Sequence, residues 1–291
     1  MKTLQITKIL QNTVLGLIGL VLPCSILNAE VDLGSAASFG VLGASTVTNT
    51  GNTVITGDLG VSPGTAITGF GPGTRSGVTY TGTDSLAVSA HHDASTAYDY
   101  LKALTPTESF TGYNNLGGQT LTPGIRNYAS SAGIDANEVL TLDGPGLYVF
   151  QTGSTWVTVT GSRMVLINGA RAEDIFFQVG SSVTLGTGTP NYGTFIARAS
   201  ITATTGASIG GRLLALDAAV TLDTNNIGVP AAAPVATPTP APPTPSPVPA
   251  ATSTPVPAAA TPTPVPTATP TPVPTAMPTP VRPIRMNLPI L

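Results

Sequence analysis

The residues best placed to carry a function are threonines that recur between two apolar residues. Thr184, Thr202 and Thr221 each stand at the centre of such a triplet, and successive copies lie 18 and 19 residues apart. A threonine side chain offers a hydroxyl that both donates and accepts hydrogen bonds, next to a methyl group. None of the three triplets contains an acid, a base or a metal ligand. The pattern therefore indicates binding by a regular surface rather than catalysis.

The other polar residues form no catalytic or metal-binding cluster. A polysaccharide-acting enzyme on a β-helix needs clustered carboxylates, whereas the acids of this chain are few and scattered. His91-His92-Asp93 has the right residue types for a metal, but neighbouring residues on a helix point in different directions, so a solvated helix face is favoured. We predict no catalytic residue, no cofactor and no metal site.

Composition excludes one class of partner. Only 9% of the residues are charged and the formal net charge is −3. Binding to nucleic acid requires a basic patch that neutralises phosphates, and the chain has none. The abundance of glycine, threonine, serine and alanine is typical of a secreted β protein, and we expect a monomer with no nucleic-acid partner.

The two ends of the chain differ from its middle. Residues 1–29 have a basic start, an apolar core and small residues near Ala29, which predicts a secretory signal peptide. Its removal would take away Cys24, the sole cysteine, so the folded part would be stable without disulfides. Most of the 28 prolines lie in residues 229–281, a Pro/Thr/Ala-rich stretch that predicts a disordered, extended linker. Residues 282–291 form a short tail, and the linker and tail together suggest association with the cell envelope.

The middle segment, 30–228, is long enough for one folded domain and repeats every 18–19 residues. Short apolar strands separated by glycine-rich corners at this period predict a β-solenoid, in which each coil adds one strand to each face. Because side chains alternate along a strand, Val183 and Leu185 should point inward and Thr184 outward. Phe177, Phe195 and Leu214 each precede a triplet by six residues and are expected at equivalent core positions.

One segment departs from the strand pattern. Apolar residues recur at helical spacing over residues 84–104, Thr83 or Asp84 can cap the start, and Pro106 follows the end. We predict a single amphipathic helix that lays its leucine and alanine stripe against one face of the solenoid. The covered face cannot then be a large binding surface.

The sequence resembles the bacterial and fungal ice-binding protein family. The stretches that carry the resemblance include "LGSAASFGVLGASTVTNTGNTVITGDLGVSPGTAITGF", "AYDYLKALTP" and "GASIGGRLLALDAAVTLDTNNI", and the match spans essentially all of residues 31–227. The resemblance implies an all-β fold, a right-handed β-helix of triangular cross-section, with interleaved N- and C-terminal coils and one α-helix alongside. It also implies that ice or ordered surface water is bound by a flat, regular, fairly apolar face.

Several members of that family carry a Thr-(Ala/Gly)-x-(Thr/Asn) pattern on the ice-binding face. Here it occurs four times, for example at Thr152-Gly153-Ser154-Thr155 and Thr202-Ala203-Thr204-Thr205, but the copies do not share one register. Together with the triplets, it gives the candidate ice-binding residues: Thr48, Thr152, Thr155, Thr158, Thr184, Thr202, Thr205 and Thr221.

Two observations oppose a simple threonine face. Tyr80 and Trp156 are expected beside the threonines as bulky neighbours, and Arg198 and Asp217 at equivalent positions of adjacent coils. Threonine also suits the solvated side of any strand, so the pattern is equally compatible with a merely soluble face. The alternative function is a secreted structural or adhesive module on the same fold, without ice activity.

Overall fold

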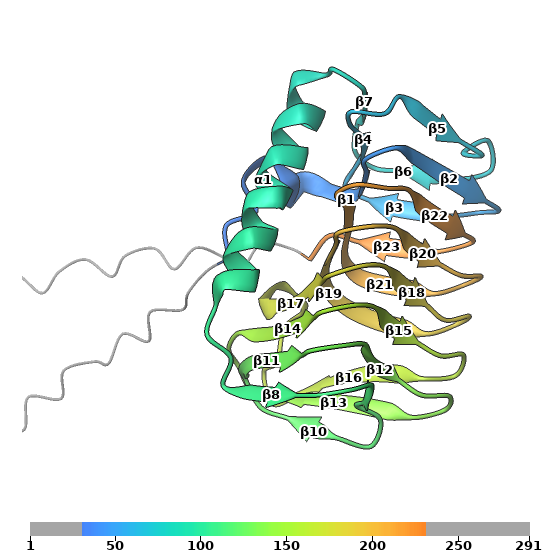
Figure 1. Cartoon of the computed structure of the whole chain (residues 1–291). Coiled ribbons are helices and arrows are strands. Elements are labelled where there is room, and N and C mark those ends of the chain that lie inside the picture. The colour runs from blue at the N-terminus through green and yellow to red at the C-terminus, as the bar shows by residue number, and fades with distance from the viewer. Residues whose placement is uncertain (1–30, 231–291) are drawn as a thin grey trace, which may run out of the picture. The chain divides into compact units, whose positions relative to one another are not determined.

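The computed structural model describes residues 31–230, and they form a β-helix with one long α-helix beside it (Figure 1). All the strand pairs are parallel, as stacked coils require. The predicted fold class is confirmed. The signal peptide, most of the linker and the tail lie outside the described residues.

Three faces make up the β-helix. Face A, beside the helix, stacks in the order β8 (Glu108–Phe110), β11 (Gly124–Tyr128), β14 (Tyr148–Thr152), β17 (Ile175–Val179), the second half of β19 (Pro190–Ala197), the second half of β21 (Ser208–Ala215), β1 (Phe39–Gly43), β4 (Asp58–Val61) and β7 (Thr79–Thr81).

Face B is a continuous sheet of eight short strands. Its order is β9 (Asn114–Asn115), β12 (Ala132–Ile134), β15 (Trp156–Thr158), β18 (Val183–Leu185), β20 (Ile201–Ala203), β22 (Val220–Asp223), β2 (Thr46–Thr50) and β5 (Ala66–Thr68).

Face C is built from β10 (Thr120–Leu121), β13 (Val139–Asp143), β16 (Arg163–Ile167), the first halves of β19 and β21, β23 (Asn226–Gly228), β3 (Val54–Thr56) and β6 (Thr74–Arg75). The strands β19 and β21 each run from face C into face A without a break, which joins face A and the strands β23, β3 and β6 of face C into one hydrogen-bonded sheet. The strands β10, β13 and β16 of face C form a separate three-stranded sheet.

The N- and C-terminal coils interleave. On face B the strand that comes first in the sequence, β2, pairs with the one that comes last, β22, and on face A β1 pairs with β21. The chain therefore starts in the middle of the stack, builds two coils and the strand β7, returns along the outside as the helix, and then builds upward to meet its own beginning (Figure 1). This seam ties strands more than 170 residues apart into one solenoid.

Aromatic rings fill the interior at the mid-height of the stack. The rings of Phe150, Phe177 and Phe195 are stacked on successive coils, with centroids 4.8 and 4.3 Å apart. Trp156, fully buried, packs against Phe177 at 4.5 Å. Such ring pairs add stability beyond the area that they bury and hold the coils in register.

Helix α1 (Ser85–Ala103) covers face A, as the sequence predicted for residues 84–104. Its buried side chains are mostly alanines, with Tyr98 and Leu101 at the C-terminal half, and small side chains let the helix approach the sheet closely. Asp84 takes the N-cap position but makes no side-chain capping bond, because its carboxylate accepts a hydrogen bond from the Thr81 amide instead. The 3₁₀ helix η1 (Gly34–Ser38) packs beside α1, and a second, η2 (Ala172–Asp174), contacts β19.

The corner between faces A and B varies in length, and this corrects one prediction. Phe195 pairs with Leu213, so Leu213 and not Leu214 continues the inward row. Three residues join β19 to β20, whereas four, 216–219, join β21 to β22. The extra residue at this corner converts a period of 18 into one of 19 without disturbing either strand.

Candidate functional site

Face B presents a central row of outward side chains in register from coil to coil. The aligned positions are Asn115, Gly133, Val157, Thr184, Thr202, Thr221, Thr48 and Thr68, from one end of the stack to the other. The residues on either side of Thr184, Thr202 and Thr221 are buried in the core. Five consecutive coils therefore expose one threonine each in a single line.

A second row lies beside the central row, and it consists of small residues except for the exposed Tyr113 at one end. The residue that precedes the first inward side chain of each strand is, in the same order, Tyr113, Ser131, Thr155, Ser182, Ser200, Ala219, Thr46 and Ala66. Hydroxyls of neighbouring coils are hydrogen-bonded within this flanking row: Thr155 donates to Ser131 over 2.8 Å, and the Ser182 and Ser200 oxygens lie 3.1 Å apart. These bonds fix the hydroxyls relative to one another, so the surface is ordered.

The spacing of both rows follows from the fold. Adjacent strands of a sheet lie roughly 4.8 Å apart, and each coil contributes one residue to each row. Hydroxyls and methyls therefore repeat at that interval along the stack. A flat sheet with short side chains creates a surface much larger than a small-molecule pocket.

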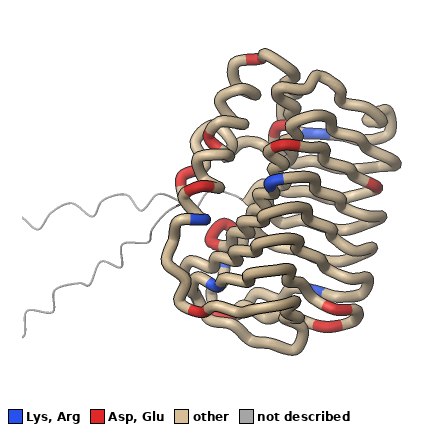
Figure 2. Tube along the Cα trace, viewed as in Figure 1, with Lys and Arg blue, Asp and Glu red and all other residues tan. Residues whose placement is uncertain are grey.

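Face B carries little charge. In the described chain neither row contains an acid, a lysine or an arginine. Asp135 and Asp223 lie one place beyond the last inward residue of β12 and β22, and Figure 2 shows few coloured positions along these strands. Both carboxylates have polar partners on the protein: Asp135 accepts from the Tyr113 hydroxyl over 2.6 Å, and Asp223 accepts from Thr205 and Thr224. Neither carboxylate is left without a partner on the face.

Tyr113 and Asp135 lie at the end of face B that lacks the threonines. Burial, the hydrogen bond to Asp135 and the charge of that carboxylate together raise the pKa of the Tyr113 phenol to about 12, with burial the largest cause. The phenol therefore keeps its proton, and keeps donating to Asp135, at any neutral pH.

Arg198 and Asp217, the charged residues that were expected beside the threonines, lie off face B. Arg198 aligns with Leu216, not with Asp217, because the second corner is one residue longer. The two side chains form an ion pair of 2.8 Å at that corner, and the Arg198 guanidinium lies 6.0 Å from the centre of the Tyr98 ring on α1. They turn toward the helix and leave the flanking row unobstructed.

The expected bulky neighbours are absent from the surface as well. Trp156 is fully buried in the core, and Tyr80 belongs to β7 on face A, where its ring contacts Phe39. Neither side chain protrudes from face B.

Six of the eight candidate threonines lie on face B or at its edge. Thr48, Thr184, Thr202 and Thr221 form the central row with Thr68, and Thr155 stands in the flanking row. Thr205 is exposed just beyond β20, where its hydroxyl donates to Asp223. Their participation in ligand binding stays a prediction.

Two candidates are not on the surface. Thr158 is only 2% exposed, because Trp156 takes the inward position on β15 and thereby shifts the alternation, so that Val157 points outward. The Thr158 hydroxyl lies 3.4 Å from that of Thr189 and accepts from the Gly186 amide. Thr152, also 2% exposed, belongs to β14 on face A. The prediction that these two residues are exposed on the binding face is therefore wrong.

Most residues of the flanking row were not predicted from the sequence as part of the binding face. Thr46, Ser131, Ser182, Ser200 and Ala219 each stand directly before a buried strand residue. The available signal is a small residue that recurs one place before each triplet, outside the repeated Val/Ile-Thr-Leu/Ala pattern itself.

The remaining faces do not offer a comparable surface. Face A is covered by α1 over much of its length. Face C carries the half-exposed ring of Tyr192 and charged side chains at its lower coils, including Arg163 and Asp143. Its outward rows are irregular in both size and polarity.

The two histidines of α1 lie apart from face B. The His91 Nε2 atom lies 2.7 Å from the Leu216 carbonyl oxygen, and Asp93 accepts from the Ser35 amide over 2.7 Å. Within residues 31–230 no group of three potential ligands is close enough to hold a metal ion. Nor is any helix of the described range long and apolar enough to cross a membrane.

The fold and face B together define a β-helical protein with an extended, regular face of repeated hydroxyls and methyls. Residues 41–228 match the model of the family described as ice-binding-like, and the chain belongs to that family.

Relatives and solved structures agree with this assignment. An ice-binding protein of Nostoc sp. (strain HG1) is 50% identical over 200 residues, which span 67% of this chain and 72% of that protein. An ice-binding protein of Flavobacterium frigoris (strain PS1) is 33% identical, spanning 69% and 76%. The crystal structure of an ice-binding protein from the Antarctic ascomycete Antarctomyces psychrotrophicus is 45% identical with a TM-score of 0.65, spanning 69% of this chain and 98% of that one.

Proposed function

We propose that this protein binds ice by adsorbing to it through face B, and that adsorption slows the growth and recrystallisation of ice. The observation that carries the proposal is the central row, in which five successive coils present Thr184, Thr202, Thr221, Thr48 and Thr68 in register. The similarity to ice-binding proteins supports the same function.

The chemistry of the face suits a crystalline water surface. Threonine hydroxyls hydrogen-bond to water, while the adjacent methyls order the water around them without competing for those bonds. The strand spacing of roughly 4.8 Å repeats both groups at regular intervals. An ice plane is itself a regular array, so many weak contacts can form at once.

Rigidity lets these contacts act together. The strands of Thr184, Thr202, Thr221 and Thr48 are hydrogen-bonded to strands on both sides, and two pairs of flanking hydroxyls, Thr155–Ser131 and Ser182–Ser200, are bonded to each other. A preordered surface loses little conformational entropy on binding. The absence of lysine and arginine from these rows of the described chain also avoids long charged side chains that would hold water away from the lattice.

Binding rather than catalysis is the function that we propose. The acids of face B, Asp135 and Asp223, belong to different coils at opposite halves of the stack, and each has its own hydrogen-bond donor. They are not positioned as a pair for acid–base chemistry.

We also propose that the protein is secreted and acts as a monomer, with residues 229–291 linking it to the cell envelope. The signal-like order of residues 1–29 and the proline-rich composition of the linker support this. Fractionation of native cells tests it: an antibody against the β-helix should detect the protein in the envelope and the medium, and detection in the cytoplasm alone would contradict the proposal.

The decisive experiment on ice binding uses the purified full-length chain. Single ice crystals grown in its presence should become faceted, and the melting and freezing points should separate. Crystals that stay round, together with unchanged freezing and unchanged recrystallisation of a polycrystalline film, would refute adsorption and favour the alternative of a structural module.

A further inference from the structure

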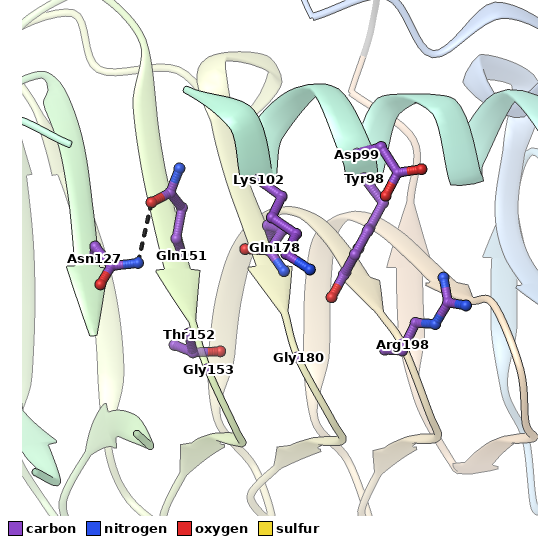
Figure 3. Close-up of a pocket in the computed structure, with 10 residues that line it drawn as sticks. All are labelled: Tyr98, Asp99, Lys102, Asn127, Gln151, Thr152, Gly153, Gln178, Gly180 and Arg198. Atoms are coloured by element: carbon purple, nitrogen blue, oxygen red, sulfur yellow. Dashed lines mark hydrogen bonds between the residues drawn. The ribbon is translucent and has the colours of Figure 1, made fainter. Parts of the chain in front are cut away.

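Polar side chains beside α1 are engaged with the protein itself. In the hollow between the helix and face A, Gln151 accepts a hydrogen bond from Asn127 and donates to carbonyl oxygens at the end of the helix (Figure 3). Arg198, at the edge of the same hollow, is paired with Asp217. Asp223 differs from these groups, because both of its carboxylate oxygens accept from exposed hydroxyls at the edge of face B.

Asp223 stands in a row that runs along the corner between faces B and C. The aligned residues of four successive coils in this corner row are Thr187, Thr205, Asp223 and Thr50. The Gly188 amide donates to the Thr205 carbonyl oxygen over 3.0 Å, and the Gly206 amide donates over the same distance to the Asp223 carbonyl oxygen. Thr50 is paired with Asp223 directly. The corner row therefore follows the same coils as the central threonine row and repeats at the same interval.

The residue that follows each member of the corner row has a left-handed backbone. Three of these residues are glycines, Gly188, Gly206 and Gly51, with φ of 68°, 72° and 74°. The fourth is Thr224, with φ of 53°. A β-branched residue rarely occupies this region, and holding it there costs conformational free energy that glycine would not lose. Thr224 therefore stands at this corner against a local cost, which indicates a role for its side chain.

The side chain of Thr224 completes the surroundings of the Asp223 carboxylate. The Thr224 hydroxyl donates to Oδ1 over 3.0 Å, and the Thr205 hydroxyl of the adjacent coil donates to Oδ2. No lysine or arginine between residues 31 and 230 forms an ion pair with this carboxylate. A hydrogen bond to an ionised carboxylate is roughly twice as strong as one between neutral groups, so both hydroxyls are held firmly.

The turn that carries the carboxylate is fixed from inside the β-helix by Asn225, which is 2% exposed. The Asn225 side-chain oxygen accepts from the Asp223 amide over 2.7 Å. Its side-chain nitrogen donates to the carbonyl oxygens of Thr204 and Ala207 on the adjacent coil, at 2.9 and 3.0 Å. The carboxylate is thereby held in a defined position relative to the coil of Thr205.

This arrangement sets the direction of the two hydroxyls. A carboxylate only accepts hydrogen bonds, so the protons of Thr205 and Thr224 point toward Asp223 and their lone pairs stay available to solvent. Asp223 itself is half-buried, whereas both threonines are exposed. The corner therefore presents ordered hydroxyl acceptors beside the central row, with the charge set behind them.

We propose that Asp223 and Thr224 are positioning residues of the ice-binding surface, and that this surface extends past face B to the corner row. This role rests on the proposed function of face B. The carboxylate fixes the Thr205 and Thr224 hydroxyls as acceptors for water molecules of the ice surface. Because these hydroxyls are ordered before docking, little conformational entropy is lost when ice is bound.

The melting–freezing gap of the full chain, measured at equal concentration beside the free energy of unfolding, tests this role. Asp223→Ala releases both hydroxyls and should reduce the gap about threefold, whereas Asp223→Asn keeps one acceptor oxygen and should retain most of it. Asp135→Ala is the matched control. Asp135 takes the same place after β12 and also accepts from a hydroxyl, but it lies at the end of face B that lacks the threonines, so the gap should be unchanged.

Thr224→Gly separates positioning from stability. Glycine suits the left-handed backbone, so the free energy of unfolding should not fall, while the gap should shrink about twofold because one hydroxyl and its bond to Asp223 are lost. A residue with a merely structural role would not lower activity without lowering stability.

Asn168→Gly is the control for that variant. Asn168 also has a positive φ, of 50°, and also donates to an aspartate, Asp143, but it follows the strand β16 of face C. Its removal should leave the gap unchanged. An unchanged or larger gap in Asp223→Ala would overturn the positioning role and leave face B as the adsorbing surface. An unmodified chain that neither shapes ice nor separates melting from freezing would instead overturn the proposed function, and this role with it.

Discussion

Faces A and B are built by the same coils, yet they meet their surroundings in opposite ways. On face A the outward row runs from amides to Ile196 and Leu214, and the helix buries it. On face B the outward row is mostly threonine and stays exposed, with no element over it in the described chain. The difference shows that the outward residues of the coils decide whether a face is covered by the helix of this chain or stays exposed.

The first prediction breaks face B at its centre. Thr202→Tyr places a ring in the middle of the central row, which would hold an ice plane away from every neighbouring threonine. Because the centre of an interface carries most of its energy, the gap between melting and freezing should fall below about a tenth of its original size.

The control for that variant is Thr56→Tyr, the same substitution at an exposed position on face C. Both proteins should show the same circular dichroism spectrum and unfolding temperature, and the control should shape ice like the unmodified chain. Equal loss of activity in the two variants would show that face B is not the adsorbing surface.

The second prediction breaks face A instead. Leu101 is fully buried between α1 and the sheet, and Leu101→Ala should lower the free energy of unfolding by about 2–5 kcal/mol. Denaturant titration measures this loss. Below its unfolding temperature the variant should still shape ice, because face B does not depend on contacts with the helix.

Val88→Ala is the matched control on the exposed side of the same helix. It removes apolar atoms without creating a cavity, and surface changes of this kind stay within about 0.5 kcal/mol. If both substitutions destabilise the protein equally, helix propensity rather than docking on face A holds α1 in place.

The third prediction concerns the pH dependence of the coils themselves. Burial raises the pKa of Tyr128, a core residue of β11 on face A, to about 12, with Arg126 lowering it and Glu108 raising it to smaller extents. In the unfolded chain the phenol ionises near its ordinary value of 10. The folded state therefore loses stability as pH rises from 10 to about 12.

Tyr128→Phe isolates this effect from other groups that titrate in the same range, such as Arg212. Denaturant titrations of both proteins should give a constant difference in unfolding free energy below pH 9, and the unmodified chain should lose more stability than the variant above pH 10. A difference that stays constant up to pH 12 would show that Tyr128 ionises equally in both states.

Much of this architecture could be predicted from sequence, and the failures have physical causes. The alternation of side chains along a strand correctly predicted Ile201 and Val220 inside and Thr202 and Thr221 outside. Only this orientation of each triplet buries both of its apolar residues. In residues 156–159 either Trp156 and Thr158 or Val157 and Val159 could point inward. The first arrangement is observed because it buries the large apolar surface of Trp156, and it buries Thr158 as well. Sequence alone gives no measure of that competition.

Corner lengths and flanking rows were harder to predict than strands. Arg198 and Asp217 were expected at aligned positions, but the extra residue between β21 and β22 removes that alignment. The two side chains form an ion pair at the edge of the face, and Arg198 lies over the ring of Tyr98 on the helix. The pairing of β2 with β22 followed only from the family resemblance, because contacts between residues far apart in the chain leave no periodic signal. The hydrogen bond between the Ser182 and Ser200 hydroxyls becomes apparent only when the coils are stacked in the structure.

The last and smallest prediction sharpens face B rather than breaking it. The threonine row stops at Val157, which occupies the next outward position in register with Thr184. Val157→Thr exchanges a methyl for a hydroxyl of nearly the same size and would extend the row to six coils. The expected gain in ice activity is less than about twofold, since one added hydrogen bond contributes little net energy.

The reverse change at the adjacent coil, Thr184→Val, should reduce activity by a similar factor, and both are read from the melting–freezing gap at equal concentration. If Val157→Thr lowers activity while Thr184→Val raises it, methyl groups rather than hydroxyls carry the adsorption, and the contrast between the two faces would be one of shape instead of hydrogen bonding.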